Sequence, residues 1–170
     1  MNKIDKKEFY YAGLILLGAA ARLAPHPANF TPTGAMAFFS GNKMAGIWAY
    51  ALPMIILLAS DAILGWHSTM LFVYAGFFAA TWLGRRCGTS RAGRLGGLGL
   101  SSAIFFTVSN LGVWLVSGMY PHNLAGLATC YAVALPFLFN EMAATMLYGT
   151  AFFWAASWIE KKAGTPAMAS

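Results

Sequence analysis

Apolar stretches separated by short polar or proline-rich breaks run along the whole chain. A helix needs about 20 apolar residues to cross the hydrocarbon core of a bilayer, and most of these stretches approach that length. The pattern therefore predicts an all-α integral membrane protein built as a six-helix bundle. The expected helices cover residues 9–24, 33–41, 47–65, 69–84, 95–118 and 136–159.

Two segments depart from the membrane-spanning pattern. Residues 33–41 are too few for a full crossing and follow a proline-rich connector, so we expect a short second helix whose backbone is shielded by other helices. Residues 124–135 are apolar but are followed by Pro136, which interrupts a helix. We therefore expect an extra short helix here, near the outer face.

The basic residues mark the connections between the segments. Three lysines precede the first segment, Lys43 follows the second, four arginines occupy a hinge at residues 85–94, and two lysines follow the last. Loops rich in lysine and arginine stay on the cytoplasmic side of a membrane. Six crossings satisfy this rule at every basic loop, whereas five or seven crossings do not, so both termini are predicted to be cytoplasmic.

This topology gives a single membrane domain over residues 1–170. Residues 1–8 form a cytoplasmic N-terminus, residues 9–159 form the helix bundle, and residues 160–170 form a cytoplasmic tail.

Composition agrees with a membrane protein and excludes several other classes. Residues are 59% hydrophobic and 9% charged, whereas a soluble domain carries about 25% charged residues. The net charge of +6 lies in the loops between apolar segments and not on one face, so nucleic-acid binding is not predicted. Cys87 and Cys130 fall on opposite sides of the predicted topology, so no disulfide is expected.

Three charged residues fall inside apolar segments, and all three lie toward the outer side. They are Arg22, Asp61 and Glu141. A charge in the hydrocarbon region is costly unless it is paired or hydrated. Two interpretations stay open: a structural ion pair of Arg22 with Asp61 or Glu141, or a group of residues around a ligand.

The outer loops carry the remaining candidates. The stretch at residues 25–32 contains His26, Asn29 and Thr31 among three prolines, which indicates a pre-organised ligand loop or an interfacial turn. Asn110 is expected to face the bundle interior, where it forms an interhelical hydrogen bond or contacts a ligand. The predicted ligand-binding residues are Arg22, His26, Asn29, Thr31, Asp61, Asn110, His122 and Glu141.

Enzymatic chemistry receives little support from the sequence. The chain has no Walker motif, nucleophile elbow or paired-cysteine motif. No catalytic residue is therefore predicted, and no cofactor is assigned. Without an ATPase motif, energy for transport must come from other chains. The three histidines, with Asp61 or Glu141, would have to converge in space to form a zinc or iron site, because no H-x-x-x-H spacing is present. No metal ligand is therefore predicted. An intramembrane metal-dependent enzyme is kept as the alternative hypothesis. A structural or assembly membrane protein is a third hypothesis.

Several motifs carry a resemblance to known proteins. The run at residues 22–32, followed by Gly34-Ala35, resembles a family of small bacterial membrane proteins described as candidate transport proteins of unknown function. The Ser60-Asp61 pair, residues 109–114 and the Tyr120-Pro121 turn are similar to that family too.

More distantly, the plan resembles the S components of energy-coupling-factor vitamin transporters, of which the cobalamin-transporting component is the nearest analogue. That resemblance implies a substrate-binding subunit of a vitamin-like uptake system in the bacterial inner membrane. It also implies contact with membrane lipid and an energising transporter module. S components often carry an A-x-x-x-A motif in their first helix, and the only match in the first helix here, Ala20 and Ala24, lies at the outer end. The chain also lacks a cysteine placed as a cobalt ligand.

Overall fold

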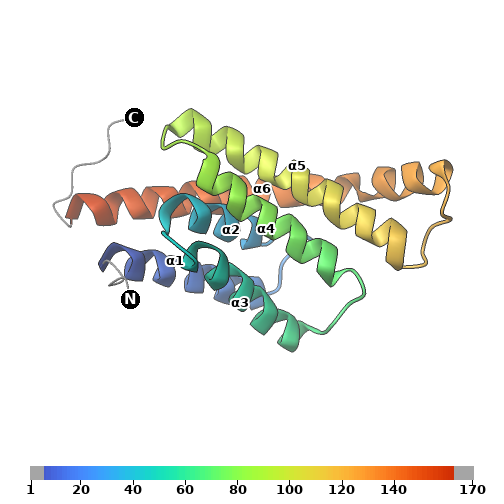
Figure 1. The fold of residues 1–170 in the computed structure, drawn as a ribbon, viewed down its shortest axis with the longest axis horizontal. Helices are drawn as coiled ribbons and strands as arrows, with labels where there is room; N and C mark the ends of the chain where they lie inside the picture. The colour runs from blue at the N-terminus through green and yellow to red at the C-terminus, as the bar shows by residue number, and fades with distance from the viewer. Residues whose placement is uncertain (1–5, 163–170) are drawn as a thin grey trace.

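The computed structural model describes residues 6–162, and within this range the chain forms six α-helices and no strand (Figure 1). The predicted all-α class is confirmed. The predicted ends at residues 1–5 and 163–170 lie outside the described residues. The helices are α1 Lys6–Leu23, α2 Thr33–Lys43, α3 Trp48–Leu64, α4 Met70–Arg86, α5 Arg91–Val116 and α6 Leu124–Lys162.

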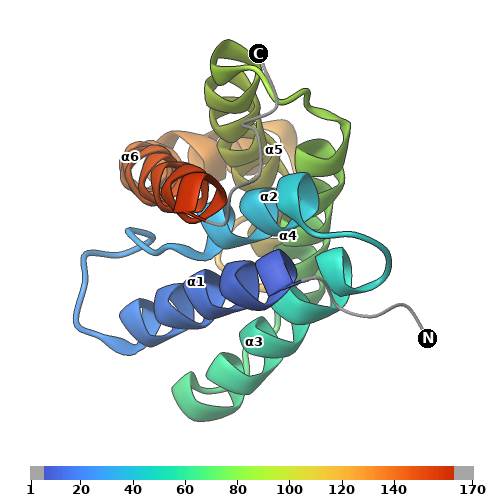
Figure 2. The same cartoon turned by 90° about the vertical axis from the view of Figure 1, so that its left-hand side faces the viewer.

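Helix α2 is short and lies at the centre of the bundle. Its 11 residues span about 16 Å, and residues 33–41 are all buried. It contacts each of the other five helices, and Figure 2 shows it enclosed among them. The predicted short second helix is thus present. Shielding by other helices applies to this helix, whereas residues 23–29 before it are exposed.

Two glycines allow α2 to cross α4 at close range. A Cβ atom added to Gly84 would collide with the carbonyl oxygen of Phe38, and one added to Gly41 would collide with that of Thr81. At the same crossing, the Asn42 side-chain amide donates to the carbonyl oxygens of Gly84, at 3.0 Å, and Cys87, at 3.1 Å. These bonds satisfy carbonyls that the end of a helix leaves unpaired.

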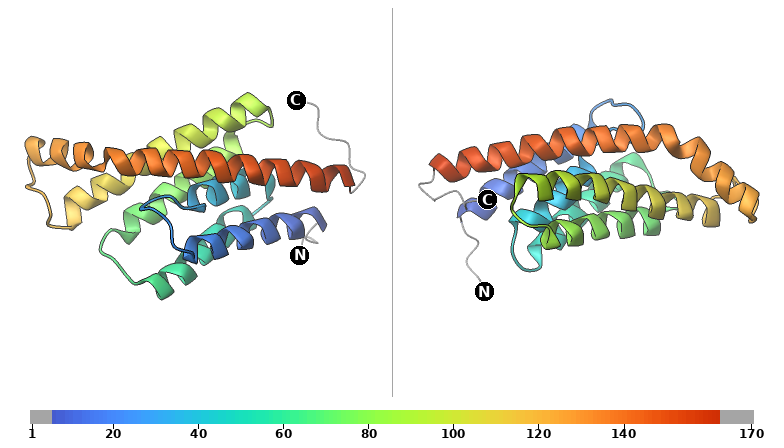
Figure 3. Two further views of the ribbon diagram at one scale, coloured as in Figure 1. Left: turned by 180° about the vertical axis from the view of Figure 1, so that it is seen from behind. Right: turned by 90° about the horizontal axis from the view of Figure 1, so that it is seen from above.

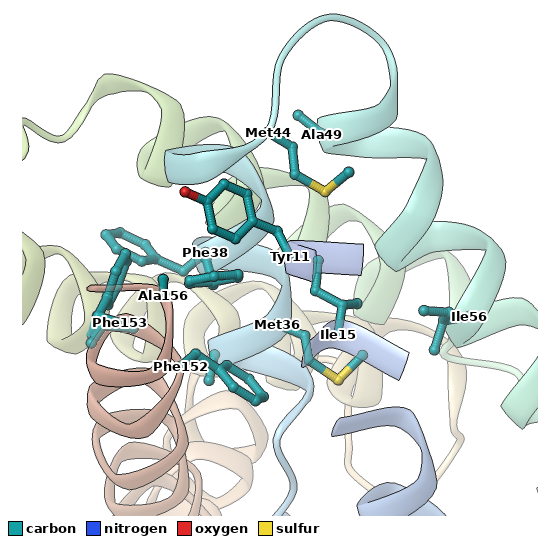
Figure 4. Close-up of a cluster of buried hydrophobic side chains, with 13 residues drawn as sticks. Tyr11, Ile15, Met36, Phe38, Met44, Ala49, Ile56, Phe152, Phe153 and Ala156 are labelled. Atoms are coloured by element: carbon teal, nitrogen blue, oxygen red, sulfur yellow. The ribbon is translucent and has the colours of Figure 1, made fainter. Parts of the chain in front are cut away.

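Aromatic side chains fill the space between α2, α6 and α1. Phe38 and Phe39 are fully buried, and the Phe39 ring lies 5.2 Å from that of Phe153, centroid to centroid. Figure 4 shows Phe152 and Phe153 of α6 grouped with Phe38, and Tyr11 and Ile15 of α1 beside them. Edge-to-face packing of this kind stabilises the core beyond the burial of apolar area.

The hinge expected at residues 85–94 is wrong in extent. Helix α4 continues to Arg86 and α5 begins at Arg91, so only four residues separate the helices. Arginine is a good helix former, and the Ser90 hydroxyl oxygen accepts a hydrogen bond from the Gly93 amide at 3.1 Å as an N-cap. The cluster of arginines therefore indicated where the connection lies but not how many residues it contains.

The separate short helix expected at residues 124–135 is also wrong. These residues form the first part of α6, which continues through Pro136 for 39 residues, or about 58 Å. The Asn123 side-chain oxygen caps its start by accepting from the Gly126 amide at 2.8 Å. Figure 3 shows α6 bent in its early part, as expected where a proline lies within a helix that neighbouring helices support.

The bundle has two chemically different ends. We call the basic end the one that holds the start of α1, the connections after α2 and α4, and the end of α6; these lie together at the left of Figure 1. There the Lys43 ammonium lies 2.6 Å from a Glu160 carboxylate oxygen, which also accepts from Tyr11. We call the opposite end the loop end, with connections at residues 24–32, 65–69 and 117–123. Cys87 and Cys130 are both free, in agreement with the sequence prediction.

Candidate functional site

A cavity of about 400 Å³ opens at the loop end. Its walls come from the loop before α2, the start of α4, the parts of α5 and α6 at the loop end, and the turn between these two helices. The lining residues are Ala28, Asn29, Thr69, Val73, Phe105, Ser109, Asn110, Val113, Met119, Tyr120, Cys130, Val133, Ala134 and Phe137.

The lining is mostly apolar, with a few side chains that can form hydrogen bonds. Asn29, Ser109, Asn110 and Tyr120 supply most of the polar atoms. Among the described residues that line the cavity, none is Asp, Glu, Lys, Arg or His. An apolar pocket with a few polar groups is the usual form of a small-molecule site. This one suits an uncharged ligand.

Asn29 reaches the cavity from a backbone position that few residues adopt. Its φ is +60°, in the left-handed region, where Asn is tolerated better than other residues with a Cβ. The loop around it is tied to α6, because the Asn140 side-chain amide donates to the Ala28 carbonyl oxygen at 3.0 Å. The Phe30 ring also meets Tyr148 of α6 edge-on. The loop is thus held on the bundle by contacts from α6.

Asn110 lies on the α5 wall of the same cavity. Its side-chain amide donates to the Phe106 carbonyl oxygen at 2.8 Å, and its own backbone carbonyl lies 3.5 Å from the Cys130 sulfur on α6. Tyr131 adds a bond between the same helices, with its hydroxyl 2.6 Å from the Thr107 carbonyl oxygen. Asn29 and Asn110 are therefore the two predicted ligand residues that the structure brings to one cavity.

Arg22 and Asp61 form an ion pair beside the start of α2. The Arg22 Nη2 atom lies 2.6 Å from Asp61 Oδ1, and Nη1 donates to the Thr33 hydroxyl oxygen at 3.0 Å. Tyr74 donates to the other Asp61 oxygen at 2.9 Å, and Thr31 donates to Thr33 at 3.1 Å. The pair anticipated from the sequence is present, and it joins α1, α3 and α4 to the first turn of α2.

Sequence reasoning did not find Tyr74. It lies in an apolar segment rich in aromatic residues, and no local pattern separates it from its neighbours. Thr69, Ser109, Tyr120 and Cys130 were likewise absent from the predicted ligand set, although they line the cavity. A hydroxyl or thiol within an apolar segment has no sequence signal that says which way it faces.

The three histidines do not meet. His26 lies within hydrogen-bond distance of the Arg22 and Pro27 carbonyl oxygens, His67 of the Thr69 hydroxyl, and His122 of the Trp114 carbonyl oxygen. None of these histidines is among the residues that line the cavity. Among the described residues, no group of three or more His, Cys, Asp or Glu side chains could hold a metal ion.

Glu141 is buried apart from both the cavity lining and the ion pair. It is 2% exposed, and its Oε1 atom accepts a hydrogen bond from the Thr145 hydroxyl at 2.9 Å. Its carboxyl faces Gly34, where any added side chain would collide with it. The eight predicted ligand residues thus do not form one site. Arg22, Thr31 and Asp61 form one network, and Asn29 and Asn110 line the cavity. Glu141, His26 and His122 belong to neither group.

The fold and site describe an all-helical protein in which two helices, α5 and α6, are long and apolar enough to cross a membrane. Residues 2–168 match DUF6580, a family of unknown function, and the chain therefore belongs to that family. No curated protein and no solved structure matches the chain.

Proposed function

We propose that this chain is the substrate-binding membrane subunit of a small-solute, vitamin-like uptake system, with its ligand in the loop-end cavity. One observation carries the proposal: the cavity is walled by segments far apart in sequence, and a few polar side chains stand among its mostly apolar lining. Ligand sites in helical bundles are commonly built this way, between facing helices.

Exposed apolar side chains support a location in the bacterial inner membrane. Leu17, Ile63, Leu71 and Trp154, on four different helices, are each more than two-thirds exposed. A water-soluble monomer rarely carries apolar surface on so many sides, whereas lipid covers it at no cost. At the basic end, the Lys162 ammonium lies 3.9 Å from the Trp158 ring centroid, as suits an aromatic belt at a membrane interface.

The distribution of charge supports an outward-facing cavity. Lysine and arginine collect at the basic end, which the positive-inside rule assigns to the cytoplasm together with both termini. The loop end, with the cavity, then faces outward and can receive a solute. The exposed arginines of the basic end face the cytoplasm, where an energising transporter module would act.

The lining narrows the class of ligand. Cavities for drug-sized ligands range from about 300 to 1,000 Å³, and 400 Å³ lies near the lower limit. A corrinoid, the ligand of the nearest analogue, is much too large for this space. We infer a small uncharged molecule with an apolar or aromatic body and a few hydrogen-bond groups.

A role for Arg22 in binding an anionic group of the ligand has less support. Both terminal nitrogens of Arg22 are already occupied, by Asp61 and Thr33. In this proposal Arg22 and Asp61 position the start of α2, and with it the loop that carries Asn29, without touching the ligand.

A ligand screen with a matched pair of variants tests the proposal. Ala134 is 5% exposed and lines the cavity, whereas Ala132 on the same helix is exposed. Ala134→Phe should fill the cavity, and Ala132→Phe should only add area facing lipid. Native mass spectrometry and thermal unfolding in detergent would be run on wild type and both variants with a panel of uncharged vitamins and heterocycles.

We expect a co-purifying or added compound to raise the unfolding temperature of wild type and Ala132→Phe but not of Ala134→Phe. A ligand at 100 times its Kd stabilises a protein by about 2.7 kcal/mol, which is readily measured. If no compound binds wild type, or if Ala134→Phe binds equally well, the cavity is not a ligand site.

The two alternative functions differ in how the structure bears on them. A structural or assembly role is favoured by the Arg22–Asp61–Tyr74 network, in which Asp61 bonds both Arg22 and Tyr74 and so joins three helices. It predicts that Ala134→Phe leaves solute uptake and growth unchanged. A metal-dependent enzyme has no comparable support, because the three histidines lie in three separate loops and each bonds a group close to it in sequence.

A further inference from the structure

Glu141 is a buried acid that the proposed ligand site does not use. It sits within α6, 2% exposed, and the hydroxyl of Thr145 one turn later donates to its Oε1 atom. The same oxygen faces Gly34 in the first turn of α2, so closely that a Cβ atom there would collide with it. The carboxyl is therefore clamped between α6 and the backbone of α2.

No cation pairs with this carboxyl among the described residues. Their two ion pairs are Arg22 with Asp61 and Lys43 with Glu160. Helix α2 carries only Lys43, at its far end, and α5 carries only Arg91 and Arg94, at its start in the basic end. The remaining titratable groups on the surrounding elements are Lys6, Lys7, Glu8, Tyr10, Tyr11 and Arg22 on α1, His26 in the loop, and Cys130, Tyr131, Tyr148, Glu160, Lys161 and Lys162 on α6.

Arg22, His26 and Tyr131 each have other partners than Glu141. Arg22 is held by Asp61 and Thr33, and His26 lies against the Arg22 and Pro27 carbonyl oxygens. Tyr131 donates to Thr107. An unpaired carboxylate in a low-dielectric interior is strongly disfavoured and must gain a counter-ion or a proton.

The surroundings of Glu141 fit a proton better than a metal cation. A hard cation needs about six oxygen ligands. The Thr145 hydroxyl is the one side-chain group described as bonding Glu141, and the side facing Gly34 is closed by backbone. A proton needs neither extra ligands nor extra space.

The position of Glu141 connects it to the loop that forms one wall of the cavity. The preceding residue, Asn140, donates to the Ala28 carbonyl oxygen, and Tyr148, two turns further along α6, packs on Phe30. Gly34, which the carboxyl touches, begins the helix that follows the same loop. Contacts before and after Glu141 therefore reach the loop that carries Asn29, and Glu141 itself reaches the first turn of α2, which follows this loop.

We propose that Glu141 is an intramembrane proton-binding site whose protonated form keeps this loop closed against α6. Loss of the proton leaves a carboxylate that competes with Asp61 for Arg22, which is itself bonded to Thr33 in the first turn of α2. Deprotonation thus loosens the start of α2 and the loop before it. The inference does not depend on the cavity's ligand, since the proton and the loop can be followed without one.

The protonation step can be measured by infrared spectroscopy of the full chain in lipid nanodiscs. Wild type should show the C=O band of a protonated carboxylic acid at neutral pH, which disappears in Glu141→Gln and converts to carboxylate bands as the pH rises. Thr145→Val is the matched control, because it removes the hydrogen bond and keeps the acid. A band that is present equally in Glu141→Gln, or a wild-type acid ionised at neutral pH, would overturn the proton site.

The coupling to the loop can be measured by hydrogen–deuterium exchange of the peptide covering residues 24–32. Wild type and Glu141→Gln are compared at each pH, which cancels the intrinsic effect of pH on exchange. We expect equal exchange at low pH and a several-fold faster exchange in wild type once Glu141 ionises. Equal exchange at every pH would refute the coupling, and suppression of the wild-type effect by sodium at constant pH would assign the site to a metal cation instead.

Discussion

The two ends of the bundle differ in how closely the helices pack around their polar side chains. At the basic end, Asn42 closes the α2–α4 crossing and Lys43 pairs with Glu160, so that polar groups tighten contacts between helices. At the loop end, polar groups also hold the helices, through Arg22 and Asp61, but a cavity of about 400 Å³ remains between α5, α6 and the loop. The comparison indicates a closed end that fixes the bundle and an open end that can accept a ligand.

The largest expected effect comes from breaking the ion pair at the loop end. Asp61→Ala leaves the Arg22 guanidinium buried without its counter-charge, which should lower the free energy of unfolding by about 3–5 kcal/mol. Unfolding in a denaturing detergent measures the change. Replacing both residues, Arg22→Met with Asp61→Leu, should recover most of the loss, since an apolar pair leaves no buried charge. If the single variant is as stable as wild type, the pair does not hold the loop end together.

The next effect is at the α2–α4 crossing near the basic end. Gly84→Ala places a Cβ against the Phe38 backbone, which cannot move aside, and should cost about 1–3 kcal/mol. Gly96→Ala is the control: it lies in α5 with open space around it, and should be neutral or stabilising by up to about 1 kcal/mol. Thermal unfolding of both variants in detergent would compare them. Equal unfolding temperatures would mean that the close crossing is not needed for stability.

A smaller effect is expected for Asn29, where two substitutions separate backbone from side chain. Asn29→Ala places a Cβ without a polar group at φ +60° and should cost about 1–2 kcal/mol. Asn29→Gly relieves that conformation, so its stability should stay close to wild type while any ligand affinity at the cavity falls. Unfolding and ligand-binding measurements on the same samples would distinguish the two. Equal affinity in Asn29→Gly and wild type would remove this side chain from the site.

The smallest effect should come from the ion pair at the basic end. The side chains of Lys43 and Glu160 are 12% and 18% exposed, so the cation is about as buried as Arg22. The Glu160 carboxylate, however, is more exposed than that of Asp61 and also accepts from Tyr11. Because Glu160 keeps the Tyr11 bond and some contact with water when Lys43 is removed, we expect a loss near the upper limit of the range of about 0–1 kcal/mol for surface pairs. Lys43→Ala should therefore change stability by no more than about 1 kcal/mol, and salt should reduce the difference. Thermal unfolding at low and high ionic strength measures it. A loss as large as that in Asp61→Ala would mean that the two ends are equally dependent on their ion pairs.

Several features of the fold were predictable because they depend on local chemistry. Runs of apolar residues with glycine and proline breaks predicted the first four helices to within about three residues at each end, and the length of the stretch at residues 33–41 predicted a short second helix. The errors were local too. The sequence reading underestimated the Ser90 cap and the ability of Pro136 to lie within a long helix, and so it misjudged where α5 and α6 begin.

The candidate site was predictable only in part. Arg22, Asp61 and Glu141 stood out because charges are rare in apolar segments, and the loop stood out for its prolines. Their grouping could not be derived, because it depends on how each helix is rotated about its axis. The orientation of α1 and α3 pairs Arg22 with Asp61, and the orientation of α6 brings Glu141 to Gly34. His26 and His122 lie in loops and are not among the residues that line the cavity.

The sequence by itself determined the all-helical class, the short second helix and the concentration of basic residues in a few connections, because apolar length and charge act within a few residues. Only the tertiary structure decided that α2 is enclosed by the five other helices of residues 6–162, that Asn29 and Asn110 share one cavity, and that Glu141 forms no ion pair within this range. These outcomes rest on close packing between segments distant along the chain, where a single glycine sets how near two helices can approach.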